Sequence, residues 1–82
     1  MTIQVQVAIY ALRQEHLGPA IRAVVDALVD HGLSPELGPM STSVRGEADD
    51  VFAALRDGFL RAAADGPQVM TVTVSSGCPE EG

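Results

Sequence analysis

The sequence predicts an α+β sandwich, in which a four-stranded antiparallel sheet carries two helices on one face. Residues 2–10 and 68–75 alternate between apolar and small or polar side chains, which is typical of half-buried strands. Two stretches, beginning near residues 17 and 49, instead repeat apolar residues at helical spacing. At 82 residues the chain is too short for a second core, so these elements must share one.

The first strand is expected over Thr2–Tyr10. Alternate residues divide it into one face of Ile3, Val5, Val7 and Ile9 and another of Gln4, Gln6, Ala8 and Tyr10. A connection over Ala11–Leu17 leads to Gly18-Pro19, which suits a helix start because proline is tolerated in the first turn. The first helix is predicted from the spacing of Leu17, Ile21, Val24, Val25, Leu28 and Val29. It should end at His31-Gly32, where glycine can adopt a left-handed conformation.

The middle of the chain predicts two strands joined by a tight turn. Leu33–Leu37 indicates a short second strand, Gly38-Pro39 a turn, and Met40–Gly46 the third strand. Pro35 is typical of a sheet edge. Alternation assigns Leu37, Met40, Thr42 and Val44 to the core and Glu36, Ser41, Ser43 and Arg45 to the opposite face. A register shift of one residue would exchange Met40 and Thr42 with Ser41 and Ser43, so their side stays open.

The last third of the chain predicts a helix and a strand. Asp49 or Asp50 should cap the helix. Its apolar stripe consists of Val51, Phe52, Leu55, Phe59, Ala62 and Ala63. Gly58 either weakens this helix or lets it pack closely on the sheet. Gly66-Pro67 separates it from the final strand, Gln68–Ser75. The order is that of a ferredoxin-like βαββαβ sandwich, expected over residues 3–76, with 77–82 as a loose acidic tail.

Charge excludes several kinds of partner. The net charge is −6, lysine is absent and the five arginines are scattered, which argues against nucleic acids and anionic membrane surfaces. No run reaches the roughly 18 apolar residues of a membrane span, and nothing resembles a secretion signal. Cys78 is the only cysteine, so no intrachain disulfide can form. A cytoplasmic protein is the default expectation.

The sheet face away from the helices has an unusual composition. It should carry neutral hydrogen-bonding groups, one tyrosine and one potential ion pair, from Gln4, Gln6, Tyr10, Glu36, Ser41, Ser43, Arg45, Thr71, Thr73 and Ser75. A face exposed only to water would hold more charge, and a purely dimeric face more large apolar residues. The pattern fits a partly dry surface or cleft between subunits where a small polar molecule binds. A solvated face or a plain oligomer interface remains the simpler interpretation.

No catalytic or cofactor motif is present. His16 and His31 flank a helix without metal-ligand spacing, and Cys78 sits beside acidic residues that would not activate a thiol. The hydroxyls of residues 41–43 have no histidine placed as a base. Asp49-Asp50 is better explained as a helix start. Acylphosphatases share the architecture, but their site needs an asparagine, which this chain lacks. We therefore expect no metal, no cofactor and no enzymatic activity.

Three segments carry a family resemblance. Ile9-Tyr10-Ala11-Leu12, Gly38-Pro39-Met40-Ser41-Thr42, and Val44-Arg45-Gly46-Glu47 with Asp50-Val51 are similar to the YkoF-type thiamine-binding family. The resemblance runs from Val5 to about Val74. One departure is Ala11, where many members have proline.

The resemblance implies a ferredoxin-like domain that associates through its sheets into dimers and tetramers. It also implies non-catalytic binding of thiamine or its hydroxymethylpyrimidine precursor. The candidate ligand-binding residues are Gln6, Tyr10, Glu36, Met40, Ser41, Thr42, Ser43 and Arg45. Hydroxyl and amide groups would meet the aminopyrimidine, and Tyr10 and Met40 would give a flat apolar contact. Arg45 would suit a phosphorylated form or orient Glu36. The alternative is a structural or regulatory homo-oligomer without such a ligand.

Overall fold

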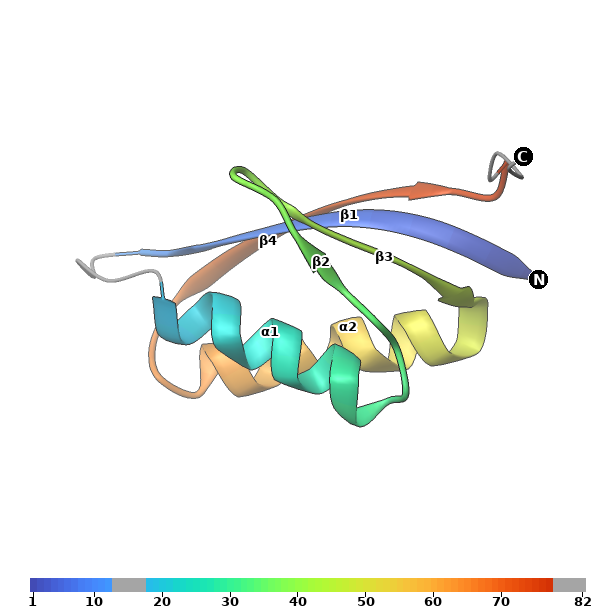
Figure 1. Cartoon of the computed structure of the whole chain (residues 1–82). Coiled ribbons are helices and arrows are strands. Elements are labelled where there is room, and N and C mark those ends of the chain that lie inside the picture. Colours follow the sequence, from blue (N-terminus) through green and yellow to red (C-terminus); the bar gives the residue numbers. More distant parts are fainter. Residues whose placement is uncertain (13–17, 78–82) are drawn as a thin grey trace.

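The computed structural model describes residues 1–12 and 18–77 and contains four strands and two helices in that part of the chain. In order they are β1 (Thr2–Ala11), α1 (Gly18–Asp30), β2 (Glu36–Leu37), β3 (Thr42–Glu47), α2 (Ala48–Ala63) and β4 (Gln68–Ser75). The strands form one antiparallel sheet in the order β2-β3-β1-β4, and both helices cover the same face of it (Figure 1). The predicted ferredoxin-like fold is confirmed.

The register of the sheet settles which side chains face the helices. Val5 of β1 lies opposite Val44 of β3 and Val74 of β4, and Val7 lies opposite Thr42. Because partners across an antiparallel ladder point to the same face, Thr42 belongs to the helix-covered side and Ser43 to the open side. Thr42 is accordingly 7% exposed. The register left open by the sequence is thus the one in which Ser43 and Arg45 share the open face.

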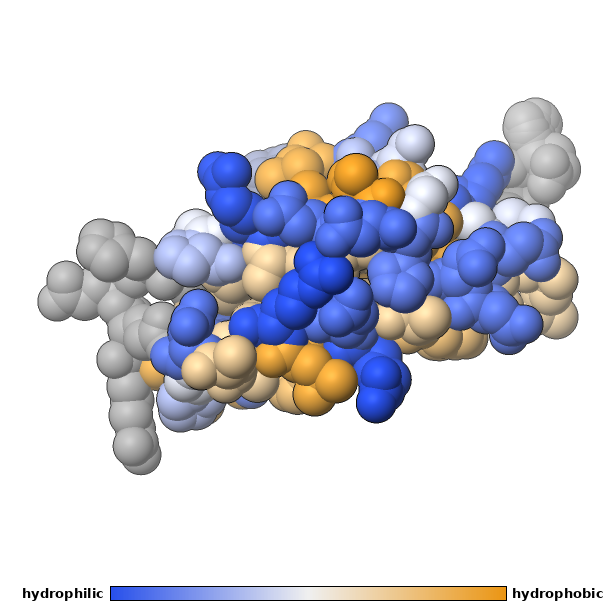
Figure 2. Space-filling model, turned by 90° about the horizontal axis from the view of Figure 1, so that it is seen from below, coloured by the Kyte–Doolittle hydropathy of each residue, from blue (hydrophilic) through white to orange (hydrophobic). Residues whose placement is uncertain are grey.

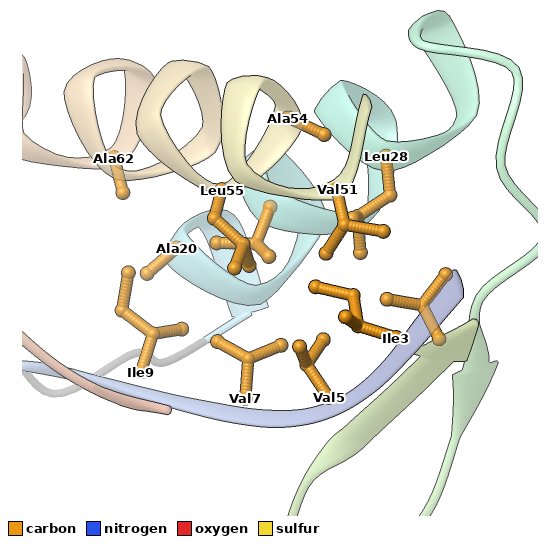
Figure 3. Close-up of a cluster of buried hydrophobic side chains, with 12 residues drawn as sticks. Ile3, Val5, Val7, Ile9, Ala20, Leu28, Val51, Ala54, Leu55 and Ala62 are labelled. Carbon is orange, nitrogen blue, oxygen red and sulfur yellow. The ribbon is translucent and has the colours of Figure 1, made fainter. Parts of the chain in front are cut away.

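The core lies between β1 and the two helices. Ile3, Val5, Val7 and Ile9 point from the sheet toward the helices, and Leu28, Val51 and Leu55 close the space from above in the view of Figure 3. Every one of these side chains is buried. Alternation along β1 therefore predicted its buried face completely, since each alternate residue of the strand meets a helix.

Helix α1 ends at a glycine with a left-handed backbone. Gly32 has φ of 81°, and Leu33 N–H and Gly32 N–H donate to the carbonyls of Leu28 and Val29 at 3.0 and 2.9 Å. This Schellman arrangement satisfies carbonyls that the helix end would otherwise leave unpaired. The predicted stop at His31-Gly32 is confirmed.

The two helices lie unusually close at Gly58. A Cβ built there would be 3.0 Å from the Cα of Val24 in α1. From the sequence, Gly58 was expected to allow close packing against the sheet, whereas the close contact is with the other helix. Polar groups bridge the same helix pair at the surface, where Figure 2 shows hydrophilic side chains running between hydrophobic patches.

This bridge is centred on Arg61. Its guanidinium contacts Asp57 through Nη2 at 2.8 Å and Nε at 3.2 Å, and Asp30 through Nη1 at 2.9 Å. His31 Nε2 lies 3.3 Å from Asp57 Oδ2. The predicted solvated helix-end histidine is therefore half-buried and has a carboxylate partner.

Several expected boundaries differ from the structure. β2 contains two residues rather than five, and Pro35 explains this, since it has no N–H to extend the ladder. α2 begins at Ala48 after Glu47, which makes no side-chain cap bond, so neither Asp49 nor Asp50 is the cap. Both aspartates lie in the first turn, where negative charge favours the helix dipole.

Other expectations concern burial or lie beyond what the structure describes. Leu37 and Met40, expected in the core, are 63% and 81% exposed, because β2 ends at Leu37 and Met40 sits in the turn that follows. Phe52, expected in the buried stripe of α2, is also exposed. His16, Leu17, Cys78 and most of the predicted acidic tail lie outside the described residues.

Candidate functional site

The turn between β2 and β3 shapes the main candidate site. Gly38 N–H donates to the Ser41 carbonyl at 2.8 Å, which closes the turn. Pro39 and Met40 therefore project beyond the end of the sheet. This geometry follows from the local sequence, since Gly-Pro favours a turn and leaves neither residue in the ladder.

A hollow of about 250 Å³ lies between this turn, β1 and α1, and we refer to it as the hairpin pocket. Its walls are Val7, Ala8, Ile9 and Tyr10 of β1, Ile21 of α1, and Leu37, Gly38, Pro39, Met40, Ser41 and Thr42. Most of the lining is apolar. The hydroxyl-bearing residues of the lining are Tyr10, Ser41 and Thr42, and the turn adds backbone groups. A small flat molecule could lie on the apolar surface while its edge meets hydroxyl and backbone groups.

A second hollow, of about 360 Å³, lies on the open face of the sheet. Gln4, Ser34, Glu36, Ser43, Val44 and Arg45 line it, and it is more open to solvent than the hairpin pocket. Glu36 and Ser43 are cross-strand partners, which brings them together. This open-face hollow offers charge and hydrogen bonds but no aromatic surface.

The predicted site residues therefore divide into groups. Tyr10, Met40, Ser41 and Thr42 line the hairpin pocket, whereas Glu36, Ser43 and Arg45 line the open-face hollow. Gln6 lines neither and borders a smaller hollow with Gln4 and Thr73 near β4. The sequence grouped Ser41 with Ser43 on one continuous face. Ser41 precedes β3, so strand alternation does not govern where it lies.

The predicted site residues did not include most of the apolar lining of the hairpin pocket, Ile21 and Leu37 among it. Ile21 and Leu37 line the hairpin pocket and also border a neighbouring hollow of about 350 Å³ along α1, whose other lining includes Arg22, Val25 and Asp26. The two hollows thus form adjoining lobes that meet at Ile21 and Leu37. The sequence did contain a signal for this neighbouring hollow, because Ile21 and Val25 are apolar residues one helical turn apart on α1. A β2 of only two residues is too short to cover both of them.

Residues 1–12 and 18–77 hold no group of three or more His, Cys, Asp or Glu side chains placed to bind a metal ion. In the same residues, neither helix is long and apolar enough to cross a membrane.

Solved structures share this fold. A hypothetical protein from Methanocaldococcus jannaschii superposes with a TM-score of 0.86 at 16% identity, over 98% of this chain and 84% of that one. A Thermotoga maritima protein, whose name proposes a role in thiamine biosynthesis or salvage, gives 0.79 at 16% identity over 92% and 83%. A Streptococcus pneumoniae protein gives 0.74 at 19% identity over 99% and 92%. Identities this low establish the fold alone.

Sequence comparison adds the family. No curated protein sequence matches this chain. A model of the YKOF-related family matches residues 2–81, which is nearly the whole chain and includes every segment of the hairpin pocket. The chain therefore belongs to the YKOF-related family.

Proposed function

We propose that this protein binds, without catalysis, a small heteroaromatic molecule of the thiamine or hydroxymethylpyrimidine type in the hairpin pocket. The observation that carries the proposal is that Tyr10, Met40, Ser41 and Thr42 line one hollow next to apolar Ile21. The fold shared with the Thermotoga maritima protein and membership of the YKOF-related family support the same ligand class. Its expected place of action is the cytoplasm.

The chemistry of the pocket suits a single substituted ring. Its volume of about 250 Å³ is below the roughly 300–1,000 Å³ typical of drug-sized ligands. The Tyr10 ring and the Met40 thioether would contact the face of the ring. The exocyclic amine and ring nitrogens of an aminopyrimidine need acceptors and donors, which the Ser41 hydroxyl and the turn backbone would supply.

The adjoining lobe along α1 would accommodate a second ring. Thiamine carries a thiazolium cation next to its pyrimidine, and the lobe holds the carboxylate of Asp26. Arg22 in the same lobe would weaken the attraction of a bare cation and favour a phosphorylated form. Thiamine would thus span both lobes across Leu37, whereas hydroxymethylpyrimidine would occupy the hairpin pocket alone.

Isothermal titration with thiamine and with hydroxymethylpyrimidine tests the proposal. Binding of either ligand should release or absorb heat. Leu37→Lys should lower the affinity for both ligands, because it places a charge where the two lobes meet. Leu60→Lys is the matched control, since Leu60 is an exposed leucine on α2 and should leave binding unchanged. Ser41→Ala should lower affinity about fivefold, the value of a net hydrogen bond of roughly 1 kcal/mol.

Two outcomes would contradict the proposal. Absence of heat at millimolar concentrations of both ligands would exclude thiamine and hydroxymethylpyrimidine as ligands of this protein. Loss of binding in Arg45→Ala and Glu36→Gln, with Leu37→Lys unaffected, would move the site to the open-face hollow. The alternative role is a structural or regulatory homo-oligomer, and the feature that favours it is the uncharged edge strand β4.

A further inference from the structure

The turn that lines the hairpin pocket presents a thioether to solvent. Met40 is 81% exposed and is also part of the pocket lining. It lies in the turn between β2 and β3 (Figure 1), which the hydrogen bond from Gly38 N–H to the Ser41 carbonyl closes. Leu37 and Thr42 pair on either side of this turn. The backbone therefore holds Met40 beside the pocket while its side chain stays accessible to small solutes.

The three methionines of the chain differ in exposure and in distance from this pocket. Met70 of β4 is partly buried and packs against the core. Met1 is 79% exposed, but it lies at the start of β1, where its ammonium is 2.9 Å from Glu47 Oε1. Val7, the first residue of β1 in the pocket lining, is about 20 Å further along the strand. Of these three described residues, only Met40 is both exposed and part of the pocket lining.

We propose that Met40 is an oxidation site at which a hydroperoxide lowers the affinity of the hairpin pocket for its ligand. The sulfur lone pair attacks one oxygen of hydrogen peroxide, the O–O bond breaks, and the leaving hydroxide takes the proton of the transferred oxygen to form water. The sulfur loses two electrons and becomes a sulfoxide, while the peroxide gains them. A methionine sulfoxide reductase reverses the step with a dithiol, which yields the thioether, a disulfide and water.

The sulfoxide changes the side chain where the ligand would meet it. This effect rests on the proposed function, in which the Met40 thioether contacts the face of a heteroaromatic ring. A thioether is apolar and polarizable, whereas a sulfoxide is polar and is solvated by water. A ring that covers the sulfoxide must displace this water, so binding loses the contact between sulfur and ring and also costs desolvation. We expect the affinity to fall about tenfold.

Oxidation at Met40 should leave the fold intact. Its exposed side chain gains an oxygen without entering the core, and the hydrogen bond that closes the turn joins backbone atoms of Gly38 and Ser41. A sulfoxide at Met70 would instead place a polar group against the core, which destabilises a packed interior. The melting temperature therefore separates a reversible change in the pocket from general oxidative damage.

Peptide mass spectrometry during treatment with hydrogen peroxide tests the site without any ligand. The full chain is used with Cys78→Ser, because Cys78 is its only cysteine and a thiol would compete for the peroxide. The Met40 sulfoxide should form roughly tenfold faster than the Met70 sulfoxide, since oxidation follows exposure. The melting temperature should stay unchanged at full conversion of Met40. A Met40 that is oxidised no faster than Met70 would overturn the proposal.

Isothermal titration of the same protein with thiamine and with hydroxymethylpyrimidine tests the effect on binding. The affinity should fall about tenfold after oxidation and recover after treatment with a dithiol and reductases for both sulfoxide epimers. Met70→Leu is the matched control, since it removes the partly buried sulfur and should still lose affinity on oxidation. Met40→Leu retains the exposed Met1, and peroxide should change its affinity less than twofold from the value before treatment.

The outcomes separate this proposal from the proposed function. Absence of heat with the unoxidised protein would exclude the ligands, and with them the change in affinity. Heat with the unoxidised protein and an equal affinity after full conversion of Met40 would overturn the oxidation site alone. An equal loss of affinity in oxidised Met40→Leu would overturn it as well, because the loss would then arise at another residue.

Discussion

The close approach of the two helices at Gly58 can be tested by Gly58→Ala, because helix propensity and helix packing predict opposite changes in stability. Glycine in the middle of a helix is about 1 kcal/mol less favourable than alanine, so propensity alone predicts that Gly58→Ala stabilises the protein. The new Cβ, however, would lie 3.0 Å from Val24 Cα and 3.4 Å from Ala27 Cβ. Carbon atoms pack best at about 3.5–4.0 Å, so the helices must separate by roughly 0.5 Å or more.

The packing cost should exceed the gain in helix propensity. Overpacking a close-packed interior costs about 1–3 kcal/mol. The first atom met belongs to the α1 backbone, which cannot change rotamer to make room. Taking about 2 kcal/mol for this cost and subtracting about 1 for propensity gives a net loss of about 1 kcal/mol in the free energy of unfolding. For a domain of this size, that lowers the melting temperature by about 4–8 °C.

Thermal unfolding followed by circular dichroism, at one fixed protein concentration, measures the effect. Ala53→Gly on the exposed face of α2 is the control for propensity and should cost about 1 kcal/mol with no packing contribution. A rise in melting temperature for Gly58→Ala would refute the reasoning, because it would show that the helices separate at little cost.

Three further predictions follow from the same structure. Leu28→Ala should lower the free energy of unfolding in urea by about 3–5 kcal/mol, because Leu28 is fully buried, and an undiminished stability would contradict the assigned core. Gly32→Ala should cost about 1–2 kcal/mol, since φ there is 81°, and calorimetry would show it as a lower melting temperature. The hydrogen bonds from Arg61 hold the pKa of Asp57 below its usual 3.8. This contribution is present above that pH and is lost as pH falls through the lowered pKa, so Asp57→Asn should flatten the acid side of the stability profile in urea titrations.

Prediction from sequence succeeded where a residue's environment follows from its neighbours along the chain. The alternation of Ile3, Val5 and Val7 identified a buried face, because a period of two residues is enough to define the two faces of a strand. His31-Gly32 identified a helix end, because a single glycine can adopt the left-handed conformation that ends a helix. It failed at Met40, where a strand pattern was extended into a turn. The same extension placed Ser41 beside Ser43, although only Ser43 lies within β3.

The sequence by itself determined the order of elements, the side of each long strand that is apolar, and the turn at Gly38-Pro39. Tertiary structure decided which apolar side chains are covered: Val5 of β1 is buried and its partner Val74 of β4 is exposed, although both have the same alternating pattern. The reason is position in the sheet, since β1 is central beneath both helices and β4 is an edge. Tertiary structure also divided the candidate ligand residues among separate hollows, because cross-strand register brings Ser43 to Glu36 while the turn brings Met40 to Tyr10.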